Sequence, residues 1–422
     1  MVKFSLSLVA LIFRAQYAPS FIPASTLPTS MATSKLSDCF KINFILLKFF
    51  AIWPGYNSSK YYKYYMVIFL LINSFIYNTL LILNLLFTPR KIDLIIREVI
   101  FLFTEVAVGG KVFMILLKRK EIFDVLNILD CEAFKGEDDP SRLIVKRHVS
   151  KYKTYWKIYA IISNLSYSLQ VFLPIFLYFI FNTKIELPIC KYYFLDDDII
   201  RHYFIFCYVY QSVGIYGHMQ YNVNIDTLIA GFLMMAIAQI EALNNILKNL
   251  KVAKNHTKDY KRMDTVQIMR LNNYLEHYEQ ILKYCSAVQD IIGITMFIQF
   301  GIASVIICVI LCGLLLSSSI EAMVFMVSYL FAMLLQIFVP AWLGTQLSHK
   351  SQELIFAAYS SEWIPRSERF KRSLNIFMER AKRNIVLTGW RLFPLSLDTF
   401  TSILKSAYSF FTLIRNVQAR ET

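Results

Sequence analysis

The sequence predicts an all-α, polytopic membrane protein with seven transmembrane helices, an intracellular N-terminus, an extracellular C-terminus and a cytoplasmic helical bundle. Of the 422 residues, 56% are hydrophobic and the mean hydropathy is +0.47, whereas the apolar share of a soluble protein is about 45–50%. The apolar residues gather in seven blocks, each long enough to cross a hydrocarbon core of roughly 30 Å. These blocks are residues 65–87, 95–117, 154–181, 203–225, 291–316, 322–345 and 391–414.

The distribution of basic residues sets the orientation of these helices. Of the 44 Lys and Arg residues, 32 lie before the first block and in every second connection, whereas 7 lie on the alternate side. Cytoplasmic segments of membrane proteins gather Lys and Arg, so the N-terminus is expected inside and the C-terminus outside. This alternation explains the net charge of +15 without nucleic acid as a partner; the surrounding partner is the lipid bilayer.

The predicted topology divides the chain into four parts. Residues 1–64 form a cytoplasmic N-terminal segment, residues 65–345 the first six membrane helices, residues 346–390 cytoplasmic helices for anchoring and assembly, and residues 391–422 the seventh helix with a short extracellular tail.

Two features of the N-terminal segment need separate interpretation. Residues 38–53 are patterned as an amphipathic helix at the inner membrane interface, which Pro54 is expected to end. Residues 1–30 begin with a charged, then apolar run like that of a signal peptide. A cleaved signal would place the next segment outside, against the charge distribution, so a mis-assigned start with Met31 as the initiator is preferred.

Helical periodicity continues beyond the fourth block to about Leu250, some 45 residues from Tyr203. At 1.5 Å per residue this helix would be roughly 65–70 Å long, about twice the membrane thickness. Half of it must therefore project into the cytoplasm, where its apolar side needs partners. Residues 354–363 and 373–387 are patterned as amphipathic helices that could supply them. The apolar residues of the projecting half are Leu228, Phe232, Met235, Ile240 and Leu243.

Enzymatic and metal-binding chemistry finds no support in the sequence. There is no Gly-rich phosphate loop and no catalytic-triad spacing, and neither the seven Cys nor the six His have the spacing of metal ligands. We therefore expect no enzymatic activity, cofactor or metal. His218, alone in the fourth block, is interpreted as a packed or hydrogen-bonded residue.

The last block carries a polar stripe. On a helical wheel at 100° per residue, its charged and hydroxyl side chains fall within about 80° of Asp398, and the opposite side is apolar. Two interpretations remain open: the hydroxyls join helices and Asp398 or Ser396 caps the helix, or the stripe lines a water-filled conduit. A conduit needs several subunits around one axis, because one helix cannot enclose it. The stripe consists of Asp398, Thr401, Ser402, Lys405, Tyr408, Ser409 and Thr412.

Several stretches resemble insect odorant receptors. They are "LGTQLSHKSQELIFAAYSSEW" after the sixth block, "ERAKRNIVLTGWRLFPLSLDTF" before the seventh, "ILKSAYSFFTLI" near the end, "WP" at 53–54 and "LPIC" at 187–190. The resemblance covers the chain from about Met31 and is most specific in the last 80 residues.

The resemblance implies a function. Members of that family form tetrameric cation channels opened by volatile odorants, in which a tuning subunit joins a common co-receptor subunit through the cytoplasmic bundle. The seventh helix lines the pore, and the channel lies in the plasma membrane of olfactory neuron dendrites. The co-receptor has a much longer second cytoplasmic loop than residues 118–153 of this chain, so the resemblance implies a tuning subunit of a heterotetramer.

The resemblance also implies where ligand and gate lie. The odorant is expected in the outer half of the bundle, among spans two, three, four and six, and an apolar ring at Leu413 and Val417 would close the resting pore. Lys405 is unexpected in a cation pathway, because its positive charge would repel the ions. It would pair with Asp398 or face a side portal between subunits. The expected pocket residues are Phe101, Thr104, Glu105, Tyr167, Gln170, Phe172, Tyr208, Gln211, Gly214, Met326 and Tyr329.

Two rival functions are weaker. A G-protein-coupled receptor needs an outside N-terminus and usually carries Asp-Arg-Tyr and Asn-Pro-x-x-Tyr motifs, which do not occur here. A transporter is expected to show an internal repeat with paired broken helices, and the sequence shows none.

Overall fold

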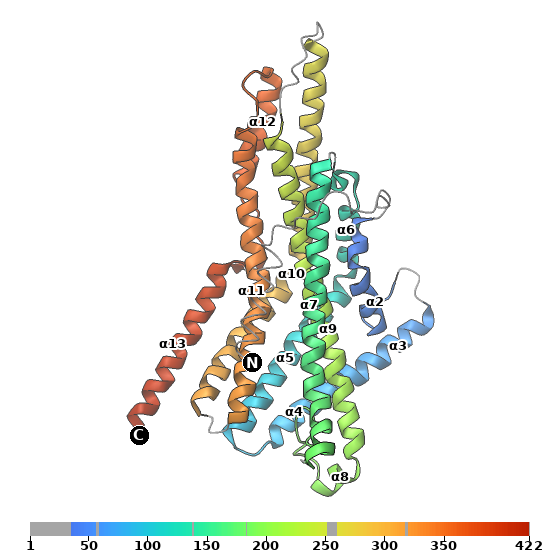
Figure 1. Cartoon of the computed structure of the whole chain (residues 1–422), viewed down its shortest axis with the longest axis vertical. Helices are drawn as coiled ribbons and strands as arrows, with labels where there is room; N and C mark the ends of the chain where they lie inside the picture. The colour runs from blue at the N-terminus through green and yellow to red at the C-terminus, as the bar shows by residue number, and fades with distance from the viewer. Residues whose placement is uncertain are drawn as a thin grey trace.

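The computed structural model describes residues 35–55, 59–136, 139–182, 184–250, 260–316 and 320–421. The expected start at Met31 lies outside these residues. The described chain is a bundle of helices along one long axis (Figure 1) with one short hairpin. Its elements are η2 (Leu36–Phe40), α2 (Lys41–Phe49), α3 (Lys60–Leu70), η3 (Leu71–Ile76), α4 (Tyr77–Phe87), α5 (Ile92–Leu117), α6 (Arg119–Leu129), η4 (Glu132–Lys135), α7 (Asp139–Phe181), α8 (Asp197–His202), α9 (Phe204–Lys248), α10 (Tyr260–Leu316), α11 (Ile320–Tyr359), α12 (Glu368–Ala381), β1 (Thr388–Gly389), β2 (Phe393–Pro394) and α13 (Leu397–Glu421).

Six helical segments of the described chain are long and apolar enough to cross a membrane: α3 to α4 taken together, α5, α7, α9, α10 and α11. They coincide with the first six predicted blocks, and the molecule is an all-α polytopic membrane protein. Helix α13 is not among the six, because charged and hydroxyl side chains occupy one side of it. It also begins at Leu397 rather than at residue 391, since the hairpin occupies the preceding residues.

Helix α9 lies at the centre of the bundle. In its most apolar stretch 94% of the residues are buried, compared with 39% or less in each of the other five segments. A helix that is apolar on all sides is stable when other helices surround it. The exposed apolar side chains of the outer helices are suited to contact lipid instead.

Helix α9 is as long as predicted, and its partners include part of the predicted segment 346–390: Asn244 donates a 3.0 Å hydrogen bond to the Lys350 carbonyl of α11. The helix ends at Lys248, and its projecting apolar side chains are buried against α7 and α11. Helix α10 begins before its predicted block and α11 continues past its own, so residues 354–359 are the end of α11 rather than a separate helix. The second predicted helix is α12, which ends at Ala381 and packs on α10 and α11. A search for long apolar blocks does not find the parts of α9, α10 and α11 beyond those blocks, because they are amphipathic.

The N-terminal helix packs against protein rather than lying free at the interface. Phe40 and Leu47 are buried, and the Asn43 side chain donates a 3.0 Å hydrogen bond to the carbonyl of Asn224 on α9. Helix α2 ends at Phe49, before the predicted stop at Pro54, and Ala51 follows with a left-handed φ of 62°.

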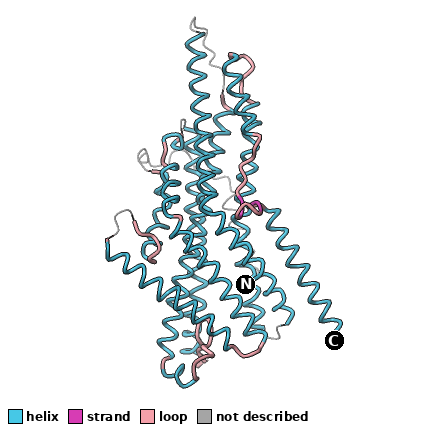
Figure 2. Tube along the Cα trace, turned by 180° about the vertical axis from the view of Figure 1, so that it is seen from behind, coloured by secondary structure: helices cyan, strands magenta, loops and turns pink. Residues whose placement is uncertain are grey.

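The hairpin of β1 and β2 lies between α12 and α13, next to the start of α13 (Figure 2). Gln289 on α10 bonds both backbone groups of Thr388, and the Trp390 amide donates to the Gly293 carbonyl at 2.9 Å. Trp390 and Arg391 both have positive φ, which costs energy for residues other than glycine. The hairpin therefore sets the direction of α13 through contacts with α10.

Candidate functional site

An ion pair lies at the centre of the predicted pocket region. Glu105 on α5 pairs with Nδ1 of His218 on α9, and both side chains are nearly buried. His218 Nε2 donates to the backbone carbonyl of Asn73 at 2.6 Å. A carbonyl can only accept, so Nε2 carries a hydrogen and the Nδ1–carboxylate contact shares a further proton. Glu105 thus has a partner at membrane depth, and His218 is hydrogen-bonded as the sequence indicated.

One turn away, α5 meets α11 through a second group of predicted residues. The hydroxyls of Thr104 and Tyr329 form a hydrogen bond. The ring of Phe101 lies 6.2 Å from that of Tyr329 and 5.8 Å from that of Phe325. Met326, beside them on α11, is buried. The structure therefore brings these predicted residues together as one aromatic wall.

The predicted residues of α7 and α9 hold the outer loop 185–195. Gln211 accepts from the amide of Ile189 and donates to the carbonyl of Cys190, at 3.0 and 2.9 Å. Gln170 donates to the Pro188 carbonyl, and the Tyr208 hydroxyl donates to the Val171 carbonyl. Gln170 and Gln211 therefore fasten the loop over the bundle, and Tyr208 joins α9 to α7.

Three other predicted residues lie at the edges of this region. The Tyr167 ring stands 5.0 Å from Tyr216 and its hydroxyl donates to the Ser212 carbonyl. Phe172 is 57% exposed, so it lies on the outside of the bundle. Gly214 lies under the ring of Tyr77, where an added Cβ would be 2.3 Å from a ring carbon.

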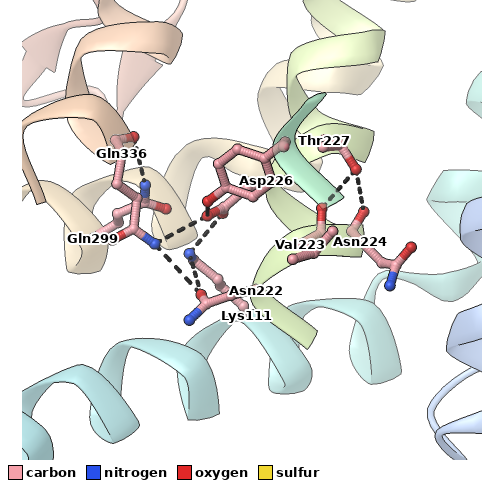
Figure 3. Close-up of polar contacts among 9 residues, drawn as sticks. Lys111, Asn222, Val223, Asn224, Asp226, Thr227, Gln299 and Gln336 are labelled. Carbon is pink, nitrogen blue, oxygen red and sulfur yellow. Dashed lines mark hydrogen bonds and ion pairs between the residues drawn. The ribbon is translucent and has the colours of Figure 1, made fainter. Parts of the chain in front are cut away.

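A second buried polar network joins side chains of α5, α7, α9, α10 and α11 (Figure 3). Lys111 Nζ of α5 pairs with Asp226 Oδ1 of α9 at 2.6 Å, and the lysine side chain is fully buried. Gln336 of α11 donates to Asp226 Oδ2 at 3.0 Å, as does the Tyr159 hydroxyl of α7 at 3.3 Å. Gln299 of α10 donates to the Gln336 carbonyl. The sequence interpretation did not single out this network, although a lysine within a span was a signal for it.

The polar stripe of α13 faces away from its own chain. Helix α13 diverges from the bundle in Figure 1 and contacts α10 and α11. Tyr408 is 64% exposed, whereas Ala407 on the opposite side is 1% exposed, and Phe400 packs 5.4 Å from Phe338. Of the stripe, Asp398, Thr401, Ser402, Lys405, Tyr408 and Ser409 are exposed, and Thr412 is partly buried.

Contacts at the start of this helix identify its cap. Ser396 rather than Asp398 caps it, because its hydroxyl accepts from the Thr399 amide at 3.2 Å. Among the described ion pairs, none joins Asp398 to Lys405, so the expected pairing is not observed. Leu413 is exposed. The side chain of Val417 lies outside the described part of the chain.

The sequence is similar to a known protein family and to individual members of it. A family model described as 7tm Odorant receptor matches residues 91–408, which is more than half of the chain. The chain is 26% identical to Odorant receptor 10 of Aedes albopictus over 184 residues, 44% of this chain and 48% of that protein. It is 22% identical to Odorant receptor 67a of Drosophila melanogaster over 279 residues, 65% of this chain and 68% of that protein. The first match spans about half of the relative's length.

Solved structures share the fold. The insect olfactory receptor OR5 from Machilis hrabei superposes with a TM-score of 0.77 at 17% identity, covering 90% of this chain and 98% of that one. Its complex with eugenol superposes with a TM-score of 0.76 at 16% identity, with the same coverage. At such identity the likeness concerns the fold alone.

Proposed function

The chain belongs to the insect odorant receptor family, and from this we propose that it is a tuning subunit of an odorant-gated cation channel in the plasma membrane. Seven membrane helices would leave the N-terminus inside and the C-terminus outside. The partner is a co-receptor subunit in a heterotetramer, and the signal is an inward current evoked by a small volatile molecule.

The observation that carries this proposal is the orientation of α13. Its apolar side packs on α10 and α11, while its charged and hydroxyl side chains point away from the chain. Polar groups at membrane depth are stable where they meet water or other polar groups. Four such helices around one axis would enclose a hydrated path, and Leu413 with Val417 would form the apolar constriction that closes it by dewetting.

The ligand pocket is assigned to the region between α5, α7, α9 and α11. Aromatic walls with few polar groups suit a small volatile molecule, and Phe101, Met326 and Tyr329 form such a wall. Glu105, already paired with His218, would orient the wall rather than bind the ligand as a free charge. The related OR5 binds eugenol, a small aromatic molecule, which supports this ligand class.

We assign the assembly surface to exposed apolar side chains of the cytoplasmic arm, which consists of the end of α11 (residues 346–359) and α12 (Glu368–Ala381). Phe356 on α11 and Ile376 on α12 are exposed there, whereas Leu374 and Phe377 are buried within the chain. A subunit interface needs apolar side chains that folding leaves uncovered, so the first pair, rather than the second, would contact the co-receptor.

Recording currents tests the function. The chain is expressed in oocytes with a co-receptor, alone, and with the pocket change Tyr329→Ala, and a panel of volatile odorants is applied. We expect odorant-evoked current with the co-receptor and a right-shifted response for Tyr329→Ala. Full odorant responses that require G-protein signalling, and no co-receptor, would overturn the proposal.

A further inference from the structure

One side of α5 carries three residues of the proposed odorant pocket. Phe101, Thr104 and Glu105 fall within about 100° on a helical wheel, with Phe101 between the other two. Thr104 contacts Tyr329 of α11, and Glu105 contacts His218 of α9. The ring of Phe101 contacts the aromatic wall and also an apolar cluster of α4, α7, α9 and the outer loop. A ligand resting on this ring therefore has the Tyr329 hydroxyl on one side and the Glu105 carboxyl on the other.

The Thr104 hydroxyl has one hydrogen, and that hydrogen goes to the backbone. Thr104 Oγ1 donates to the Ile100 carbonyl at 2.8 Å, and a carbonyl can only accept. In the bond between the hydroxyls of Thr104 and Tyr329, the hydrogen is therefore that of Tyr329. Both hydroxyl hydrogens are used within the protein, and the Tyr329 oxygen offers a ligand its lone pairs alone.

Glu105 also presents an acceptor. Its Oε2 contacts Nδ1 of His218, and in the described part of the chain Oε1 forms no hydrogen bond. Whether the shared proton lies on Oε2 or on Nδ1, Oε1 carries none and can only accept. The two oxygens that flank Phe101 thus have the same hydrogen-bonding character.

Other donors of this region are committed or distant. The Tyr167 hydroxyl donates to a carbonyl of α9 at 3.3 Å, and the Tyr208 hydroxyl donates to a carbonyl of α7 at 2.6 Å. Arg97 lies over the ring of Phe325, two turns before Thr104 and so about 10 Å away along α5. The hydroxyls beside Phe101 therefore have no hydrogen left to donate.

A ligand can reach these acceptors, because the wall is not fully covered. Phe101, Thr104, Glu105 and Tyr329 are each partly exposed, and the Glu105 side chain is 11% exposed. An acceptor held away from water is stabilised by a donor that reaches it. A ligand hydroxyl supplies such a donor, whereas a ligand carbonyl would place its oxygen against two further acceptors and gain no hydrogen bond.

We propose that this pocket selects neutral alcohols and phenols, whose hydroxyl donates to the Tyr329 oxygen while their apolar part rests on Phe101. Glu105 Oε1 repels the oxygen of an aldehyde, ketone or ester of the same shape. Volatile amines can also donate, but in water they are mostly charged, and an apolar pocket does not replace their hydration. The inference rests on the proposed function, since it names the ligand class of the same pocket.

Matched ligand pairs test the selection. The full-length chain, purified with its co-receptor, is heated with benzyl alcohol or benzaldehyde, cyclohexanol or cyclohexanone, and hexanol or hexanal; the co-receptor alone is the blank. A bound ligand raises the apparent Tm with its concentration, which gives a Kd without any current. We expect the Kd of each alcohol to be about 3- to 10-fold lower than that of its carbonyl partner, the effect of one hydrogen bond.

Variants separate the two hydroxyls. Tyr329→Phe removes the acceptor, so it should weaken alcohol binding about 3- to 10-fold and leave the carbonyl compounds unchanged. Thr104→Val frees the Tyr329 hydrogen, so the carbonyl compounds should bind about 3- to 10-fold more tightly while the alcohols keep their acceptor. Thr79→Val is the matched control, because Thr79 Oγ1 makes the same type of backbone bond, to the Phe75 carbonyl, at an exposed position of α4. It should change neither class of ligand.

Three results would overturn the selection: a mean Kd ratio of one across the three pairs, no binding of any alcohol up to its solubility, or unchanged carbonyl affinity in Thr104→Val. Since Tm is read without current, these results leave the channel proposal standing. Alcohol-selective binding without alcohol-evoked current in oocytes would do the reverse.

Discussion

The Lys111–Asp226 pair is the most consequential pair of residues outside the predicted pocket. Taking both charges out of water is costly, and the pair is stable because further groups satisfy the remaining oxygens. Asn222 accepts from Lys111 at 2.8 Å, and Gln336 donates to Asp226. The pair lies between the pocket region and the cytoplasmic arm, so it fixes the spacing of α5, α9 and α11.

Removing one partner of this pair should destabilise the protein by about 3–5 kcal/mol, because the other charge stays buried and unpaired. We expect Asp226→Leu to lower the apparent Tm strongly in fluorescence-detected size-exclusion chromatography. Lys111→Met combined with Asp226→Leu should recover much of that loss, since no charge remains.

The matched control is Lys118→Met, which removes a more exposed lysine that pairs with Glu121 at 3.0 Å; such pairs contribute about 0–1 kcal/mol. If the double variant at 111 and 226 were no more stable than Asp226→Leu alone, the two charges would not act as a pair.

The two sides of helix α13 have different surroundings: one packs against the chain and the other is exposed. Its exposed stripe runs from Asp398 to Ser409, and its apolar side rests on α10 and α11. Some hydroxyls bond to their own helix, as Thr401 does to the Asp398 carbonyl and Thr412 to the Ser409 carbonyl. Such bonds satisfy the hydroxyl hydrogen and leave oxygen lone pairs for water.

Single cysteines on the two sides of α13 should react differently with a hydrophilic thiol reagent during odorant stimulation. Ser402→Cys and Ser409→Cys should react at least tenfold faster than Ile403→Cys and Ala407→Cys, because thiolate forms poorly in apolar surroundings. Reaction is followed by loss of current. Equal rates on both sides, with reagent access established, would mean that the stripe joins helices.

The native cysteine at position 39 provides an internal background for that experiment. Burial raises the pKa of the Cys39 thiol to about 12, so at pH 8 roughly one thiol in ten thousand is the reactive thiolate. Its reactivity should rise with pH up to that value. The unmodified chain should therefore show no labelling at Cys39 by mass spectrometry at pH 8.

In the cytoplasmic arm, the apolar side chains that stabilise the fold differ from those that remain exposed for assembly. Helix α12 buries Leu374 and Phe377 against the chain, and Phe377 packs 5.1 Å from Tyr278. The same arm exposes Phe356 and Ile376. The amphipathic pattern of residues 346–390 does not tell which apolar side chains serve assembly; the structure shows that Leu374 and Phe377 belong to the core.

Changing Phe356 and Ile376 together to Ser should abolish pull-down of the co-receptor while the chain remains folded. The comparison variant is Leu374→Ser, which should instead lower the free energy of unfolding by about 2–5 kcal/mol, because it removes a buried side chain. Yield in a monodisperse peak reports folding, and co-purification reports assembly. Undiminished co-purification of the double variant would place the interface elsewhere.

For the molecule as a whole, continuous helices join the membrane segments to the part of the bundle that is expected in the cytoplasm. Helices α7, α9, α10 and α11 cross the expected inner boundary without a break. A rigid helix transmits displacement along its length, so a change in the pocket region can reach the arm and the hairpin before α13. The basic residues that flank these helical extensions are expected to set the orientation of this unit.

The orientation can be tested with terminal tags. We expect an antibody to label a C-terminal tag on intact cells and an N-terminal tag after permeabilisation, because Lys and Arg are retained on the cytoplasmic side. The converse pattern would reverse the topology and favour a G-protein-coupled receptor.

Periodicity and charge in the sequence were sufficient for the features that depend on local pattern. Six membrane segments, the long fourth helix and the two-sided character of α13 each follow from the repeat of side chains along one helix. Glu105 and His218 were recognisable as unusual residues, because ionisable groups within a span need partners.

The pairing of distant residues came from packing, which local pattern does not encode. Glu105 meets His218, and Lys111 meets Asp226, because five helices bring together side chains that lie more than 100 positions apart. The same packing buried Leu374 in the core and placed α2 against α9. Periodicity reports which side of a helix is apolar; whether lipid, another helix or another subunit covers that side depends on the whole arrangement.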